Sequence, residues 1–122
     1  MSLRIGVDVG GTNLRIGVVQ DLKVVHEQRI HADFAAICRS NSPDQALNQI
    51  VEAMSLGLQQ ILDEYAEVSS IGIGFPGFID PQTGILASSP NLPGLHNIDF
   101  ATALSQKIQL PVRVENDALV AA

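Results

Sequence analysis

The chain has 122 residues, the size of one ordinary domain, and 46% of them are hydrophobic while 16% are charged. This composition excludes an intrinsically disordered chain and is sufficient for a buried core. Seven basic and thirteen acidic residues give a net charge of −6, which argues against a nucleic-acid surface, because such surfaces need clustered Lys and Arg.

Three β-rich segments open the chain, at residues 3–9, 14–19 and 24–30. The link between the second and third, Asp21-Leu22-Lys23, is short, and short links join antiparallel neighbours. The sequence therefore predicts an antiparallel meander of three strands at the start of the fold.

A long amphipathic helix is predicted next. Ser42 is placed as its N-cap, Pro43 as its first residue and Gln45 as the partner in a capping box. Apolar residues then follow at three- and four-residue steps, which is the spacing of one helix face. The members of this stripe are Leu47, Ile50, Val51, Met54, Leu58, Ile61, Leu62 and Tyr65.

Residues 68–75 predict another strand, in which Ile71 and Ile73 alternate with small residues. A strand that follows a helix after a meander implies a crossover connection and a mixed sheet. Residues 80–84, Asp-Pro-Gln-Thr-Gly, are typical of the tip of a small hairpin.

The last third of the chain predicts a helix, a strand and the start of another helix. Asp99 is the expected N-cap of the first helix, which stops before Pro111. Residues 111–115 predict a short strand, and a further helix is expected to begin at Asp117.

Residues 7–15 carry the most informative motif. A strand ends at Asp8 and turns through Gly10 and Gly11, whose missing side chains let backbone N–H groups approach an anion. Thr12 adds a hydroxyl, and Asp8 can face a metal-bound phosphate directly or through water. The motif is not a Walker A loop, because no lysine precedes Lys23. An ordinary β-turn is the alternative.

Gly72, Gly74 and Gly77 match the G-x-G-x-x-G pattern of dinucleotide-binding folds. That fingerprint requires a helix to open within the motif, whereas Pro76 lies inside it and strand and turn residues follow. We expect Pro76 and Gly77 instead to bring bare backbone to the wall of a cleft.

Two further polar residues are candidate ligands. Asn91 lies between Pro90 and Pro93 in a stiff loop, where its amide can donate to and accept from a hydroxyl-rich ligand; a turn without a ligand is the alternative. Asp117 follows a strand end and begins a helix, so its carboxylate is favoured in the ionised form that accepts a hydroxyl proton. A plain helix cap is the alternative for Asp117.

Membrane and thiol chemistry are not expected. No apolar stretch reaches the ~20 residues of a membrane span and no positively charged leader is present, so we expect a soluble, cytoplasmic protein without membrane or nucleic-acid partners. Cys38 is the one cysteine of the sequence, which excludes an internal disulfide and a zinc site of several thiolates.

Four segments together resemble the ROK family of repressors, open reading frames and sugar kinases. They follow the family's order and approximate spacing, and they are residues 8–13, 71–77, 89–94 and 111–117. The resemblance implies a ribonuclease-H-like (actin-like ATPase) α/β domain with a mixed sheet. It also implies a glucokinase-like enzyme that transfers a phosphoryl group from ATP, with Mg²⁺, to a hexose hydroxyl.

The roles of individual residues are carried over from that resemblance. The implied ATP-phosphate and Mg²⁺ residues are Asp8, Gly10, Gly11, Thr12 and Asn13, with Asp8 near the metal. The implied sugar-binding residues are Gly77, Asn91, Asn116 and Asp117. Asp117 is the implied catalytic base, which activates the hydroxyl on carbon six.

The resemblance covers one lobe of such a kinase. We expect residues 1–122 to form a single domain, the N-terminal lobe of a two-lobed enzyme, and to be inactive alone. Any zinc site is expected only in the other lobe, and the full-length protein is expected to be a homodimer.

Two alternative functions remain open. One is the effector-binding lobe of a sugar-responsive ROK transcriptional repressor, although Asp8 comes too soon after Met1 for a preceding DNA-reading helix if Met1 is the natural start. The other is a sugar-binding module without catalysis. Leu95-His96 replaces a tryptophan of many relatives, so the sequence does not name the sugar.

Overall fold

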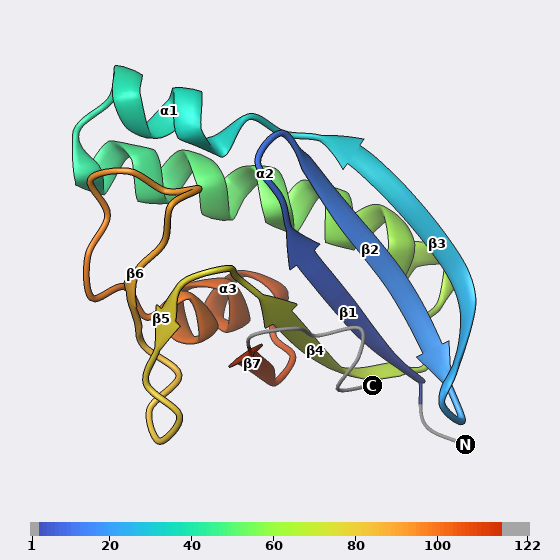
Figure 1. Cartoon of the computed structure of the whole chain (residues 1–122). Coiled ribbons are helices and arrows are strands. Elements are labelled where there is room, and N and C mark those ends of the chain that lie inside the picture. Colours follow the sequence, from blue (N-terminus) through green and yellow to red (C-terminus); the bar gives the residue numbers. More distant parts are fainter. Residues whose placement is uncertain (1–2, 116–122) are drawn as a thin grey trace.

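A five-stranded mixed sheet forms the centre of the fold in the computed structural model, which describes residues 3–115 (Figure 1). The strand order is β3-β2-β1-β4-β7. The strands are β1 Leu3–Val9, β2 Asn13–Gln20, β3 Lys23–His31, β4 Val68–Gly74 and β7 Val112–Glu115. β1, β2 and β3 are antiparallel neighbours, while β4 pairs parallel with both β1 and β7. The predicted meander and mixed sheet are therefore confirmed.

The turn between β2 and β3 is tighter than the predicted three-residue link. Gln20 pairs with Lys23, so only Asp21 and Leu22 lie between the strands. Both have positive φ, 52° and 66°, which is the conformation of the hairpin turn that matches the twist of two strands. One β-bulge between Val18 and Val19 then shifts the register of the β2–β3 pair.

The predicted long helix is α2, Pro43–Glu64, and its predicted N-cap Ser42 and first residue Pro43 are confirmed. The Gln45 backbone N–H donates to Ser42 Oγ at 3.3 Å, and Pro43 occupies the first turn. The second predicted helix is α3, Phe100–Ile108, where Asp99 accepts from the Thr102 N–H at 3.1 Å. A third helix, α1 Phe34–Ser40, was not predicted. It has seven residues, which is too short to show a periodic apolar stripe.

One face of the sheet packs against the helices, and the long green helix α2 lies behind it in Figure 1. The buried side chains on this face come from alternate strand positions, as the two-residue period of a strand requires. They include Ile5, Val7, Ile16, Ile71 and Ile73, and α2 contributes Ile50, Met54, Leu58 and Ile61 to the same core. Phe75 and Phe100 stack with ring centroids 4.8 Å apart and join α3 to this core.

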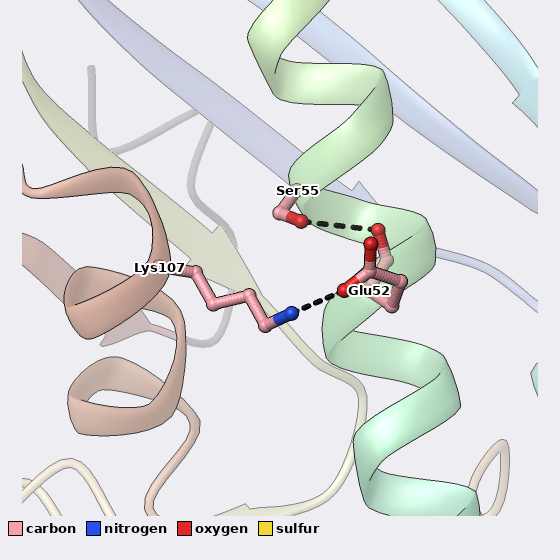
Figure 2. Close-up of polar contacts among 3 residues, drawn as sticks. All are labelled: Glu52, Ser55 and Lys107. Carbon is pink, nitrogen blue, oxygen red and sulfur yellow. Dashed lines mark hydrogen bonds and ion pairs between the residues drawn. The ribbon is translucent and has the colours of Figure 1, made fainter.

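Helices α2 and α3 lie side by side, and an ion pair joins Glu52 to Lys107 (Figure 2). Ser55 Oγ donates to the Glu52 backbone carbonyl at 3.1 Å in the same view. The two paired residues also line a groove of about 750 Å³ between the helices. Both charged side chains are about half exposed, so the pair lies in water rather than in the core.

The predicted small hairpin is also present, as β5 Phe78–Ile79 and β6 Leu86–Ser88. Asp80 fixes its tip, because its carboxylate accepts the N–H groups of Gln82 at 2.8 Å and Thr83 at 3.3 Å. The helix expected from Asp117 lies outside the described residues. Among the helices of residues 3–115, none combines the length and the apolar character needed to cross a bilayer.

Candidate functional site

All four motif segments predicted from the sequence approach one edge of the sheet. β1, β4 and β7 are parallel, so their carboxyl ends lie at the same edge. β1 ends at Val9, β4 at Gly74 and β7 at Glu115, and each end belongs to, or directly precedes, one of the predicted motifs. A hydrogen bond from the Phe75 N–H to the Glu115 carbonyl, 3.2 Å long, holds two of these ends together.

Asp8 and Glu115 share a row across this edge. Asp8 pairs with Gly74, and Gly74 pairs with Glu115, so the three residues lie on one face of the sheet. This face is opposite the one that packs on α2. The Glu115 Oε2 atom is buried and has no hydrogen-bond partner among residues 3–115.

The turn between β1 and β2 is fixed at its base and open at its tip. The Gly10 N–H donates to the Asn13 carbonyl at 2.9 Å, and a Cβ on Gly10 would lie 3.0 Å from that oxygen. A Cβ on Gly11 would meet no atom within 4 Å. The Thr12 carbonyl accepts from the Ala32 N–H at 2.8 Å, which ties the turn to the segment after β3.

A hollow of about 340 Å³ lies at this turn. The residues that line it are Asp8, Val9, Gly10, Gly11, Thr12, Asn13, Arg15 and Arg29. All five predicted phosphate- and magnesium-site residues are therefore in one place. A rigid turn with a bare, open backbone is an arrangement that can bind an anion.

Gly77 lies where the end of β4 leads into the hairpin, and its backbone requires glycine. Its φ is +150°, and a Cβ there would lie 2.2 Å from the Ser88 carbonyl oxygen. Ser89 Oγ donates to the Pro76 carbonyl at 2.5 Å and accepts from the Asn91 N–H at 3.3 Å. The predicted proline–glycine segment and the predicted asparagine loop are thus locked together.

Asn91 links that loop to the phosphate turn. Its side-chain Nδ2 donates to the Val9 carbonyl at 3.4 Å, across 82 positions of sequence. The side chain is half-buried. An asparagine amide carries two N–H donors and a carbonyl acceptor, so this one bond holds the group in place and leaves capacity for a ligand.

The dinucleotide-binding reading of the three glycines fails on the structure. Gly77 leads into β5 of a two-stranded hairpin, and no helix opens within the motif to receive a pyrophosphate. Pro76 and Gly77 are both exposed, and their place at the wall of a cleft stays a prediction. Asn116 and Asp117 lie outside the described residues, so their predicted roles stay predictions.

Two basic residues of the hollow were not predicted, Arg15 and Arg29. Arg15 Nε donates to Glu27 Oε1 at 2.5 Å and is nearly half exposed. Arg29 pairs with Arg15 in the strand ladder and forms no ion pair within residues 3–115. Arg15 is the last residue of the 7–15 motif, but Arg29 reaches the hollow only through the register of β3.

Within residues 3–115 no three His, Cys, Asp or Glu side chains come together as a cage for a metal. Asp8 is the carboxylate that lines the hollow at the turn. Mg²⁺ commonly takes one or two protein carboxylates and completes its coordination with phosphate oxygens and water. Asp8 beside an open turn of bare backbone fits that mode of binding.

Comparison with known proteins identifies the family of this chain. A model of the ROK family matches residues 4–122. The chain belongs to the ROK family. The match includes every segment that carried the resemblance, and the five-stranded sheet with its meander is that of the actin-like ATPase lobe of ROK proteins.

Individual ROK relatives are sugar kinases. The chain is 30% identical over 115 residues to the glucokinase of Thermotoga maritima, covering 93% of this chain and 33% of the relative. It is 30% identical to the N-acetyl-D-glucosamine kinase of Haemophilus influenzae, covering 93% and 34%.

A solved ROK structure shows the same fold. The ROK family glucokinase of Streptomyces griseus, determined in complex with glucose and AMPPNP, matches with a TM-score of 0.75 and 26% identity. The alignment covers 94% of this chain and 33% of that structure. This chain therefore spans about a third of the length of the ROK kinases that it resembles.

Proposed function

We propose that residues 1–122 are the N-terminal lobe of an ATP-dependent hexose kinase. The observation that carries the proposal is the hydrogen bond from Asn91 to the Val9 carbonyl, which brings the candidate sugar loop against the candidate phosphate turn. Phosphoryl transfer requires donor and acceptor to be held in line and within contact distance. The kinship with glucokinase and N-acetyl-D-glucosamine kinase supports a hexose or hexose derivative as the acceptor.

The phosphate end of the site is assigned to the turn after β1. The backbone of Gly10 and Gly11, with the polar side chains of Thr12 and Asn13, is proposed to bind the ATP phosphates. Asp8 is proposed to hold Mg²⁺ directly or through water. The metal, when bound, neutralises charge on the transferred phosphoryl group.

The sugar end of the site is assigned to the loop and the two strand ends beside it. Gly77 presents backbone without a side chain, Asn91 presents an anchored amide, and Asn116 is proposed as a further hydroxyl ligand. Asp117 is proposed to orient the sugar hydroxyl and to accept its proton during transfer. In each case the polarity of the group suits a polyhydroxylated ligand.

The isolated chain is proposed to be catalytically inactive. It spans about a third of its relatives' length, so a second lobe would supply the remaining nucleotide and sugar contacts. Incubation with ATP, Mg²⁺ and glucose, mannose or N-acetylglucosamine should give no sugar phosphate above background. Turnover above background would overturn this part of the proposal.

Ligand binding to the 122-residue chain tests the two ends of the site separately. We expect Mg·AMPPNP to shift the amide NMR signals of residues 10–13, and glucose to shift those of Gly77 and Asn91. Asn91→Asp keeps the size of the side chain but removes both amide donors, so it should abolish the sugar shifts and spare the nucleotide shifts. Sugar binding without nucleotide binding would contradict the kinase and favour the sugar-binding module.

A further inference from the structure

The hollow at the β1–β2 turn has a basic side as well as a glycine side. Arg15 and Arg29 line it together with the residues of the turn. They are two of only seven basic residues in a chain that carries thirteen acidic ones. Their position is therefore not the consequence of a generally basic surface.

The two arginines are directly opposite each other in the β2–β3 ladder. Directly opposed residues of antiparallel strands point to the same face with Cβ atoms ~5 Å apart, and like charges in such a pair are destabilising. Glu27 accepts from Arg15, which offsets one of the two charges. Arg29 has no ion-pair partner within residues 3–115, and the Asp8 carboxylate of the same hollow lies opposite Arg15 rather than Arg29 in the strand ladder.

A β-bulge produces this arrangement. At the turn, Gln20 pairs with Lys23 and Val19 with Val24, which without a bulge would set Gln28 opposite Arg15. The bulge between Val18 and Val19 shifts the register by one residue, so that Arg29 takes that place. Because neighbouring residues of a strand point to opposite faces, the shift turns Arg29 toward the hollow.

We propose that Arg29 is a phosphate-binding residue for the phosphoryl donor. This inference rests on the proposed function, in which the glycine turn holds phosphate. A guanidinium binds phosphate oxygens through two parallel N–H donors, and a bound anion relieves the repulsion between Arg29 and Arg15. Asp8 on the same rim would repel the anion, so a cation such as Mg²⁺ would be needed between the two at that side.

Isothermal titration of the 122-residue chain tests the assignment with two probes, Mg·ATP and inorganic tripolyphosphate with Mg²⁺. Arg29→Ala should weaken the binding of both probes about five- to tenfold, which corresponds to the net contribution of a typical hydrogen bond because the site is solvated. Arg29→Lys should recover part of the loss. Lys23→Ala is the matched control, because it removes the same charge from the exposed far end of the same strand, and it should change affinity less than twofold.

Thermal unfolding without ligand supplies a second readout. Removal of one of two opposed positive charges should leave the Tm of Arg29→Ala equal to or above that of the wild type, whereas a purely structural role would lower it.

Three results of the titration would contradict the proposal. If the wild type binds the probes and Arg29→Ala and Lys23→Ala bind them equally well, the assignment of Arg29 is overturned, while the assignment of phosphate to the glycine turn stands. Loss of ATP binding alone would assign Arg29 to the nucleoside, and absence of any wild-type binding would overturn the phosphate site itself.

Discussion

Asp8 and Glu115 lie in one row on the same face of the sheet, with Gly74 between them. Glycine has no side chain, so nothing on β4 separates the two carboxyl groups at this row. Adjacent strands are ~4.8 Å apart, which puts the two Cα atoms about 10 Å from each other. Residues that are far apart in the sequence are thereby brought to one edge, the edge to which the proposed site is assigned.

The side chains of Ser89 and Asn91 attach their loop to this edge of the sheet. Ser89 ties its loop to Pro76, and Asn91 ties it to Val9. Each bond joins a side chain of the loop to a backbone carbonyl at or just after the end of a strand, so the loop is anchored to the sheet. Asn91, one of the proposed sugar ligands, is therefore pre-positioned, which lowers the entropy lost on binding.

Gly11→Ala should block phosphate binding without unfolding the protein. A Cβ at Gly11 meets no atom of the protein within 4 Å, and its φ is not positive, so the fold accepts it. The added methyl group would stand at the open tip of the turn, where the backbone has to approach the anion. Titration with Mg·ATP should show at least about tenfold weaker binding, and urea unfolding should change by less than about 0.5 kcal/mol.

Gly10→Ala is the contrasting variant at the same turn. Its Cβ would lie 3.0 Å from the Asn13 carbonyl, so a loss of stability accompanies any loss of binding. Unchanged ATP affinity in Gly11→Ala would contradict the assignment of phosphate to this turn.

Gly77→Ala should be strongly destabilising. The φ of +150° is unfavourable for an alanine, and the new Cβ would lie 2.2 Å from the Ser88 carbonyl, a backbone atom that cannot rotate away. We expect a loss of about 3 kcal/mol or more in the free energy of unfolding, measured by urea denaturation. Gly84→Ala, with φ of +73° and its nearest atom 4.0 Å away, should lose only about 1 kcal/mol. Equal losses in the two variants would show that the contact with Ser88 is relaxed in solution.

Local signals made most of the fold predictable. The strands, the capping residues Ser42 and Asp99, and the hairpin tip at Asp80 all depend on neighbours within a few residues. Helix α1 could not be predicted because seven residues contain too little of a periodic pattern. The same distinction holds for the candidate site. The glycine turn could be predicted because its residues are adjacent in the sequence, whereas the position of Arg29 depends on a β-bulge that no local sequence pattern indicates.

Cys38 should react slowly and should weaken the fold at high pH. Burial raises the pKa of its thiol above the ordinary value, and the positive charge of Arg39 only partly opposes that shift. Because the folded state holds the proton more tightly, stability is unaffected below the ordinary thiol pKa and falls as pH rises through the raised pKa. Labelling at pH 8 should be slower for the folded chain than for the urea-unfolded chain.

The pH effect of Cys38 can be isolated by comparison with Cys38→Ala. The variant loses packing at every pH, but its stability should fall less steeply than that of the wild type between pH 8 and pH 10. All other ionisable groups are the same in the two proteins, so their contributions cancel in the difference. Identical slopes would mean that the thiol pKa is the same in the folded and unfolded chains.

The Glu52–Lys107 pair should contribute little to stability even though it joins two helices (Figure 2). Both side chains are about half exposed, and an exposed pair gains little because water screens the charges and two long side chains lose freedom. A double-mutant cycle with Glu52→Gln and Lys107→Met should give a coupling energy below about 1 kcal/mol, decreasing further in 1 M salt. The matched control is Glu64→Gln with Lys107→Met, since Glu64 is exposed at the end of the same helix and forms no ion pair within residues 3–115. A coupling of 2 kcal/mol or more would require the pair to be shielded from water in solution, which would mean that the groove between α2 and α3 is covered there.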